Sequence, residues 1–171
     1  ASDAEDDDFF GSSVSIYGDT AVVGAYGEDT GGSLAGAAYV YQRTNGRWSQ
    51  TQKLVASDAF AGDNFGISVS IYEKVIVLSA YLKNTFAGAA YVFEKSGGTW
   101  TQTQKLEPDV SGVFFGTDVK IYGGEDGRDG TIAISAVGYG SSRGAVYIFK
   151  KLQSGNWERQ HIIYPDSLGA N

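Results

Sequence analysis

The chain has no cysteine, no methionine and a single histidine among its 171 residues. Without cysteine it can form no disulfide framework, no thiolate zinc site and no cysteine nucleophile. With His161 as its single histidine, the chain cannot form a histidine-rich metal centre. Residues 159–163 around His161 are typical of a strand. A phosphate-binding loop and a dinucleotide glycine fingerprint are also missing. These absences predict that the protein is not an enzyme, with a glycosidase that uses two loop carboxylates as the one remaining catalytic alternative.

Basic clusters and long apolar runs are missing as well. The net charge is −7 and the pI is about 4.6, with lysine and arginine scattered along the chain. Because a nucleic-acid partner needs a clustered basic face, we expect none. No apolar run approaches the ~20 residues of a membrane-spanning helix, so we expect no membrane insertion. The chain begins inside an acidic run, residues 1–8, which favours a mature product or a cut-out piece.

Glycine and aromatic residues are abundant, at 24 residues and 13% of the chain. This composition suits many short strands joined by tight turns. The chain also contains three copies of nearly the same sequence pattern, about fifty residues apart. Each copy contains a Phe-Gly pair, an apolar run, a Gly-Ala segment and a tryptophan, and the Phe-Gly pairs and tryptophans are Phe10-Gly11, Phe65-Gly66, Phe115-Gly116, Trp48, Trp100 and Trp157. A repeat of this length, written in short strands, predicts propeller blades or another β-array.

Each copy divides into four expected strands, which in the first copy cover about residues 12–17, 20–25, 37–42 and 48–54. Val14 and Ile16 alternate with serines, which predicts a half-buried strand. The continuous apolar run at 21–23 predicts a strand covered on both faces. Asn45-Gly46 is a strong hairpin signal between the last two strands. No segment has a sustained 3.6-residue apolar period, so we expect essentially no α-helix.

The repeats span residues 1–55, 56–107 and 108–164, and residues 165–171 resemble the opening of a fourth. We therefore expect one partial β-propeller domain over residues 1–171. Three blades are too few to close a ring, which typically needs four to eight. The chain is then a segment of a longer array, or copies of it assemble into a homo-oligomer such as a six-bladed ring. An open stack with exposed sheet edges is the third possibility.

These recurring elements together resemble the FG-GAP repeat, the unit of the integrin α-subunit β-propeller. The resemblance covers the whole chain and implies an all-β fold of four-stranded antiparallel blades arranged radially. It further implies an extracellular or cell-surface location, and work in adhesion or ligand binding rather than catalysis. One departure is the proline of the Gly-Ala-Pro element, which is missing from all three copies.

The second departure concerns calcium. Calcium-binding members of the family carry an Asp-x-Asp-x-Asp-Gly loop between the first two strands of a repeat. The corresponding turns in the first two copies are too short to surround an ion. The loop of the third copy, residues 123–130, is long enough, but its acids Glu125, Asp126 and Asp129 depart from the alternating pattern. A Ca²⁺ site completed by carbonyl oxygens and a solvated hairpin loop are the two alternatives.

The expected contact surface consists of the loops that differ between copies, residues 26–35, 81–87, 123–130 and 137–143. Loops on a rigid scaffold commonly carry function. The tyrosines and tryptophans that recur at equivalent positions are explained by packing. Tyr26, Tyr81 and Tyr139 lie in the loops and are the candidate ligand contacts. We expect a non-catalytic extracellular binding or adhesion module for a protein or glycan ligand; the alternatives are a lectin-like propeller and a purely structural subunit.

Overall fold

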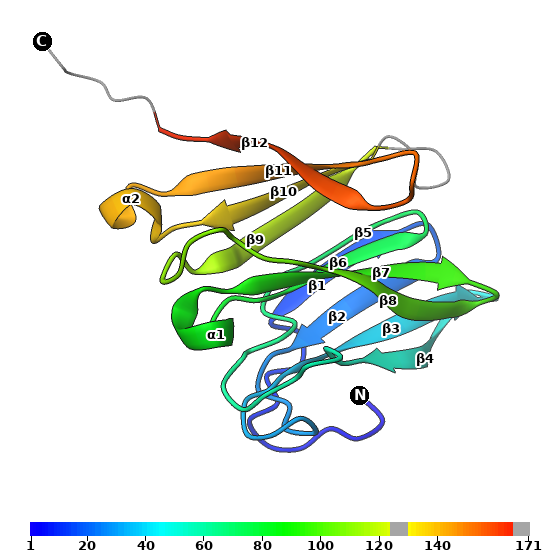
Figure 1. Ribbon diagram of the computed structural model, residues 1–171. Helices are drawn as coiled ribbons and strands as arrows, with labels where there is room; N and C mark the ends of the chain where they lie inside the picture. Colours follow the sequence, from blue (N-terminus) through cyan, green and yellow to red (C-terminus); the bar gives the residue numbers. More distant parts are fainter. Residues whose placement is uncertain (124–129, 166–171) are drawn as a thin grey trace, which may run out of the picture.

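The computed structural model describes residues 1–123 and 130–165. It confirms the all-β expectation: the described strands form three four-stranded antiparallel sheets, here called blades, which stack on one another and do not close into a barrel (Figure 1). Blade 1 contains β1 (Ser13–Tyr17), β2 (Thr20–Ala25), β3 (Ala37–Thr44) and β4 (Arg47–Leu54). Blade 2 contains β5 (Val69–Tyr72), β6 (Val75–Ala80), β7 (Ala89–Ser96) and β8 (Thr99–Leu106). Blade 3 contains β9 (Phe115–Tyr122), β10 (Thr131–Ala136), β11 (Ala145–Lys151) and β12 (Trp157–Ile163).

Two four-residue helical turns, α1 (Lys83–Phe86) and α2 (Tyr139–Ser142), lie in the loops. Asn84 and Thr85 have φ of 53° and 56°, and Gly140 and Ser141 have φ of 59° and 61°. These left-handed values make both segments single turns rather than regular helices. Within the described residues, no helix is long and apolar enough to cross a membrane.

The first strands of neighbouring blades are joined by serine hydroxyls. Ser13 Oγ accepts a hydrogen bond of 3.1 Å from the Val69 amide, and Ser68 Oγ accepts one of 3.1 Å from the Val119 amide. Ser15 and Ser70 repeat the contact two residues further along each strand. The serines therefore face the following blade, and the valines and isoleucines between them face the preceding blade. We call these two sides of a blade its trailing face and its leading face.

A glutamine on the fourth strands of blades 1 and 2 makes a second inter-blade contact. Gln52 Nε2 donates to the Trp100 carbonyl at 2.7 Å, and the Trp100 amide donates back to Gln52 Oε1 at 2.8 Å. Gln104 and Trp157 repeat this two-way pair between blades 2 and 3. The buried apolar residues accordingly gather into two main clusters, one between blades 1 and 2 and one between blades 2 and 3.

The second and third Phe-Gly pairs also join the blades. Phe65 is fully buried and packs edge-on against Tyr91 and Phe93 of its own blade. Its backbone pairs with Gly36 of blade 1, and a Cβ on Gly36 would lie 2.1 Å from the Phe65 carbonyl oxygen. Gly36 has φ of +85°, so both its conformation and its close contact require glycine. The motif therefore supplies a core ring and a close backbone approach.

The burial of blade 1 differs from the sequence-based expectation. Val14 and Ile16 of β1 are 68% and 63% exposed, whereas the serines between them face blade 2. The apolar side of β1 is its leading face, which no blade covers within the described residues. For the same reason β6 is buried along its whole length, as expected for a strand covered on both faces, but Ala21 and Val23 of β2 are partly exposed.

Candidate functional site

One end of the stacked blades carries the segments that differ most between repeats. The meander order of each sheet places the β2–β3, β6–β7 and β10–β11 loops at the same end as the linkers between blades. Both α1 and α2 lie at this end (Figure 1). The hairpin turns between first and second strands lie at the opposite end. We call the former the loop end, and it contains three of the four loops expected to form the contact surface.

An aspartate in each linker ties the loop end to the blade below it. The Tyr91 hydroxyl donates to Asp58 Oδ1 at 2.8 Å, and the Tyr147 hydroxyl donates to Asp109 Oδ1 at 3.0 Å. Lys105 lies 2.9 Å from Asp58. Lys105 also lies over the ring of Tyr91, so the Asp58 carboxylate is bonded both to a buried tyrosine and to the cation that covers it. Asp109, Tyr147 and Arg159 repeat the arrangement in blade 3, and in both blades it fixes the linker to the sheet.

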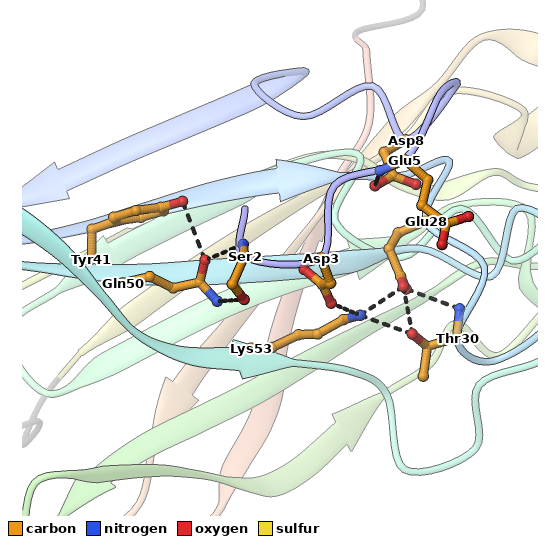
Figure 2. Close-up of polar contacts among 9 residues, drawn as sticks. All are labelled: Ser2, Asp3, Glu5, Asp8, Glu28, Thr30, Tyr41, Gln50 and Lys53. Carbon is orange, nitrogen blue, oxygen red and sulfur yellow. Dashed lines mark hydrogen bonds and ion pairs between the residues drawn. The ribbon is translucent and has the colours of Figure 1, made fainter.

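Blade 1 builds its own version of this cluster from the N-terminal segment (Figure 2). Lys53 Nζ donates to Asp3 Oδ2 and to Glu28 Oε1, both at 2.6 Å. It also donates to Thr30 Oγ1 at 2.8 Å, so one ammonium joins β4, the N-terminal segment and the β2–β3 loop. These charge-assisted bonds hold the loop in place.

Two further contacts anchor the N-terminal segment (Figure 2). The Ser2 amide donates to Gln50 Oε1 at 3.0 Å, and the Glu5 amide donates to the buried Asp8 carboxylate at 2.9 Å. In blade 2 the Ser57 amide donates to Gln102 Oε1 at 3.0 Å, which is the equivalent of the bond from Ser2 to Gln50 in blade 1. The acidic start of the chain therefore contacts blade 1 as the segment before β5 contacts blade 2.

The protonation behaviour of these groups follows from their partners. The hydrogen bond from Lys53 lowers the pKa of Asp3. Burial opposes ionisation of Asp58, but the Lys105 and Tyr91 hydrogen bonds outweigh it and lower its pKa below the usual value. Burial, reinforced by the adjacent Asp58, raises the pKa of Tyr91. The linker carboxylates thus stay ionised and the tyrosine stays neutral, which is the protonation state that a structural hydrogen bond requires.

Lys83 of blade 2 occupies the position of Glu28 in blade 1, and it forms a different ion pair. Its side chain is buried, and its Nζ donates to Asp63 Oδ2 at 2.6 Å and to the Asp58 carbonyl oxygen. Asp63 also accepts a hydrogen bond of 2.9 Å from the Phe60 amide. One buried ion pair therefore connects the linker at 58–63 to the start of α1.

Two hollows flank α1. The first, of about 380 Å³, is lined by residues 60–63 and 82–85, and the second, of about 340 Å³, by Asn84, residues 87–88 and residues 107–111. Phe60 stands 71% exposed at the first hollow, and Phe86 of α1 is 48% exposed. An exposed ring in the lining of a hollow on a fixed scaffold, here Phe60, is a feature of a binding surface.

The three candidate tyrosines lie at the loop end but are not brought together. Tyr26 stacks flat on Phe9 with ring centroids 4.8 Å apart. Tyr139 lies 5.4 Å from the ring of Tyr164. Tyr81 lies 6.4 Å from the ring of Phe114. Each ring is half-buried and already has an aromatic neighbour.

Sequence reasoning missed Phe60 and Phe86. A usable signal existed, because both are aromatic residues in segments where the other copies carry no aromatic residue at the equivalent place. The predicted metal ligands Glu125, Asp126 and Asp129 lie outside the described residues. Across residues 1–123 and 130–165, no group of three or more His, Cys, Asp or Glu is placed to hold a metal ion.

Comparison with known families gives a direct match. A model of the FG-GAP repeat matches residues 1–41 and 48–93, which together make up half of the chain. No curated protein matches the sequence. FG-GAP repeats form β-propeller-like modules that typically take part in binding and are generally non-enzymatic. The matched residues and the three four-stranded blades together assign this chain to the FG-GAP repeat family.

Proposed function

We propose that the protein is a non-catalytic extracellular binding or adhesion module that contacts a protein ligand through the loop end of blade 2. The observation that carries this proposal is the pair of exposed rings at this end, Phe60 in the lining of one hollow and Phe86 on α1. The buried Lys83–Asp63 pair holds this surface in one conformation, so little ordering entropy is lost when a ligand binds.

A protein ligand fits this surface better than a sugar. Stacking on a sugar requires a free aromatic face, but Tyr26 and Tyr139 are packed against other rings. Phe60 and Phe86 have no hydroxyl to bond a sugar. Phe86 also packs against the ring of Phe114, but both phenylalanines offer exposed apolar area, which is the property of a protein-interface anchor. The lectin-like alternative is tested beside the protein ligand with a panel of oligosaccharides.

The test uses the full chain immobilised on a sensor and two sets of probes, a panel of purified extracellular matrix proteins and a panel of oligosaccharides. We expect saturable binding to at least one protein of the panel. Phe60→Ser/Phe86→Ser removes both anchors and is expected to weaken this binding at least tenfold, since burying a side chain of this size contributes about 1.5–3 kcal/mol. The matched control is Tyr122→Ser, which removes an exposed ring at the opposite end of blade 3 and leaves the binding unchanged.

Two results would contradict the proposal. One is protein binding that is equally strong in the Phe60→Ser/Phe86→Ser variant. The other is saturable binding to oligosaccharides alone, which would favour the lectin-like function. The extracellular part of the proposal is tested separately by labelling intact, unpermeabilised producing cells and their medium with an antibody, and it fails if the protein is detected solely after permeabilisation.

A further inference from the structure

Three tyrosines form a row of contacting rings at the end of the molecule that carries the turns between first and second strands. Tyr17, Tyr72 and Tyr122 are the last residues of β1, β5 and β9. The rings of Tyr17 and Tyr72 have centroids 4.9 Å apart, and those of Tyr72 and Tyr122 have centroids 5.9 Å apart. Tyr17 is 39% exposed and Tyr72 is half-buried, so reagents in solution can reach the closer pair.

The junction between blades 1 and 2 holds Tyr17 and Tyr72 in this position. Ser15, two residues before Tyr17, accepts a hydrogen bond of 3.1 Å from the amide of Ile71, the residue before Tyr72. The Tyr17 hydroxyl also crosses the junction and donates to Glu73 Oε1 at 3.4 Å. The two phenols are therefore fixed side by side by contacts on both sides of the ring pair.

Neighbouring phenols have a characteristic reaction, which is oxidative coupling. A phenol that loses one electron and one proton becomes a radical, and two such radicals combine through the ring carbons ortho to their oxygens. Desolvation and the adjacent Glu73 carboxylate raise the pKa of Tyr17, so its hydroxyl is protonated at neutral pH and its oxidation must release a proton. The carboxylate that already accepts this hydroxyl is placed to take up that proton.

We propose that Tyr17 and Tyr72 are a site of oxidative cross-linking, joined through a carbon–carbon bond between their ortho ring carbons by a hydrogen peroxide-dependent peroxidase. Each phenol gives up one electron and one proton, the two radicals form the bond, and the ortho hydrogens then move to the phenolic oxygens. Hydrogen peroxide takes up the two electrons and two protons and becomes two molecules of water. Proximity favours coupling within one chain over coupling between chains.

The product ties β1 of blade 1 covalently to β5 of blade 2. Like a disulfide, this bond closes a long loop and reduces the entropy of the unfolded chain, so it stabilises the junction. Tyr139 and Tyr164 are the competing pair, with hydroxyls 3.3 Å apart and ring centroids 5.4 Å apart. Tyr164 lies past the end of β12, whereas Tyr17 and Tyr72 each end a strand that the junction holds, so we expect Tyr17 and Tyr72 to couple first.

The test treats the dilute full chain with hydrogen peroxide and a haem peroxidase, beside a sample of N-acetyltyrosine that shows the oxidant to be active. Cleavage after lysine and arginine places Tyr17 in the peptide 1–43 and Tyr72 in the peptide 54–74, where it is the one tyrosine. We expect mass spectrometry to find these peptides linked with the loss of two hydrogen atoms, with fragmentation placing the bond on Tyr17. The treated chain should remain at the chain mass of 18.2 kDa and melt at a higher temperature.

Tyr72→Phe keeps the ring but removes the phenol, and it is expected to abolish both the linked peptide and the rise in melting temperature. Tyr122→Phe, the matched control in the same row, should retain both. The proposal is overturned if N-acetyltyrosine couples but the linked peptide is absent, if Tyr139 and Tyr164 couple while Tyr17 stays unmodified, or if only chain-to-chain links form. Phe60 and Phe86 lie at the loop end, so failure here is separate from failure of the proposed function.

Discussion

Lys83 is a buried lysine that links two loops of blade 2 through an ion pair. A lysine in a loop normally projects into solvent, yet this side chain is buried and bonded to Asp63 and to the Asp58 backbone. At the equivalent place in blade 1, Glu28 bonds Lys53 instead, so the two repeats reverse the sign of the charge and retain a salt bridge. An exchange of this kind preserves the loop position while the sequence changes.

Removing the Lys83 cation is expected to destabilise the protein. Lys83→Met leaves the buried Asp63 carboxylate without its ion-pair partner, which costs about 3–5 kcal/mol when one member of a buried pair is removed. Urea unfolding followed by far-UV circular dichroism measures the loss, and Lys150→Met, a change at an exposed lysine of β11, is the control. Combining Lys83→Met with Asp63→Asn should recover part of the loss; a single variant as stable as wild type would contradict the role of the pair.

The linker aspartates predict an acid dependence of stability. The pKa of Asp58 is lowered in the folded protein from its ordinary 3.8, because its bonds to Lys105 and Tyr91 outweigh the effect of burial. A lowered folded-state pKa stabilises the fold above the unfolded value, and this contribution disappears as the pH falls through the folded value. Asp58→Asn should therefore lower the free energy of unfolding at pH 6 and have a smaller effect near pH 3. A difference that is constant across this range would show that the ionised carboxylate is not responsible.

The first strand of each repeat has two different faces with different tasks. In the first two repeats the serines accept amide hydrogen bonds from the next blade, and in the second and third repeats the valine and isoleucine pack on the blade before. Alternation alone marks a strand, but it does not say which neighbour each face meets. In β1 the apolar face turned out to be the uncovered one.

Removing one junction hydroxyl tests this division. Ser70→Ala leaves the buried Ile121 amide without its acceptor, and an unsatisfied buried donor costs about 1–3 kcal/mol. Chemical denaturation gives the change in the free energy of unfolding. Ser12→Ala, a change at an exposed serine in the segment before β1, serves as the control. Equal effects of the two substitutions would show that the junction hydrogen bond contributes nothing.

In the whole molecule, the two main apolar clusters lie between blades rather than inside them. Val22 and Val40 of blade 1 belong to the same cluster as Ile76 and Phe93 of blade 2. The apolar residues of one blade are therefore buried by packing against the neighbouring blade, as in other repeat proteins. Stability in such a stack is a property of the junctions.

This arrangement predicts cooperative unfolding. Because blade 2 contributes to both clusters, loosening it removes the packing of blades 1 and 3 as well. Tryptophan fluorescence should report mainly the exposure of the buried Trp100 and Trp157 on unfolding. This signal and far-UV circular dichroism should give the same urea midpoint. Two separated midpoints would show that one terminal blade unfolds independently, and Phe115→Ala at the second junction would then shift one midpoint alone.

The sequence by itself determined the repeat, the strands and the family. Turn glycines, period-two alternation and recurring Phe-Gly pairs are local features, and they predicted strands that lie within about two residues of those observed in blade 1. The tertiary structure decided which face of β1 is uncovered, where Lys83 is bonded and which loop aromatics are exposed. Each of these depends on segments distant in sequence, such as Ser13 and Val69, which are 56 residues apart. Local patterns do not encode such contacts, because the same alternating strand satisfies its pattern with either face toward a neighbour.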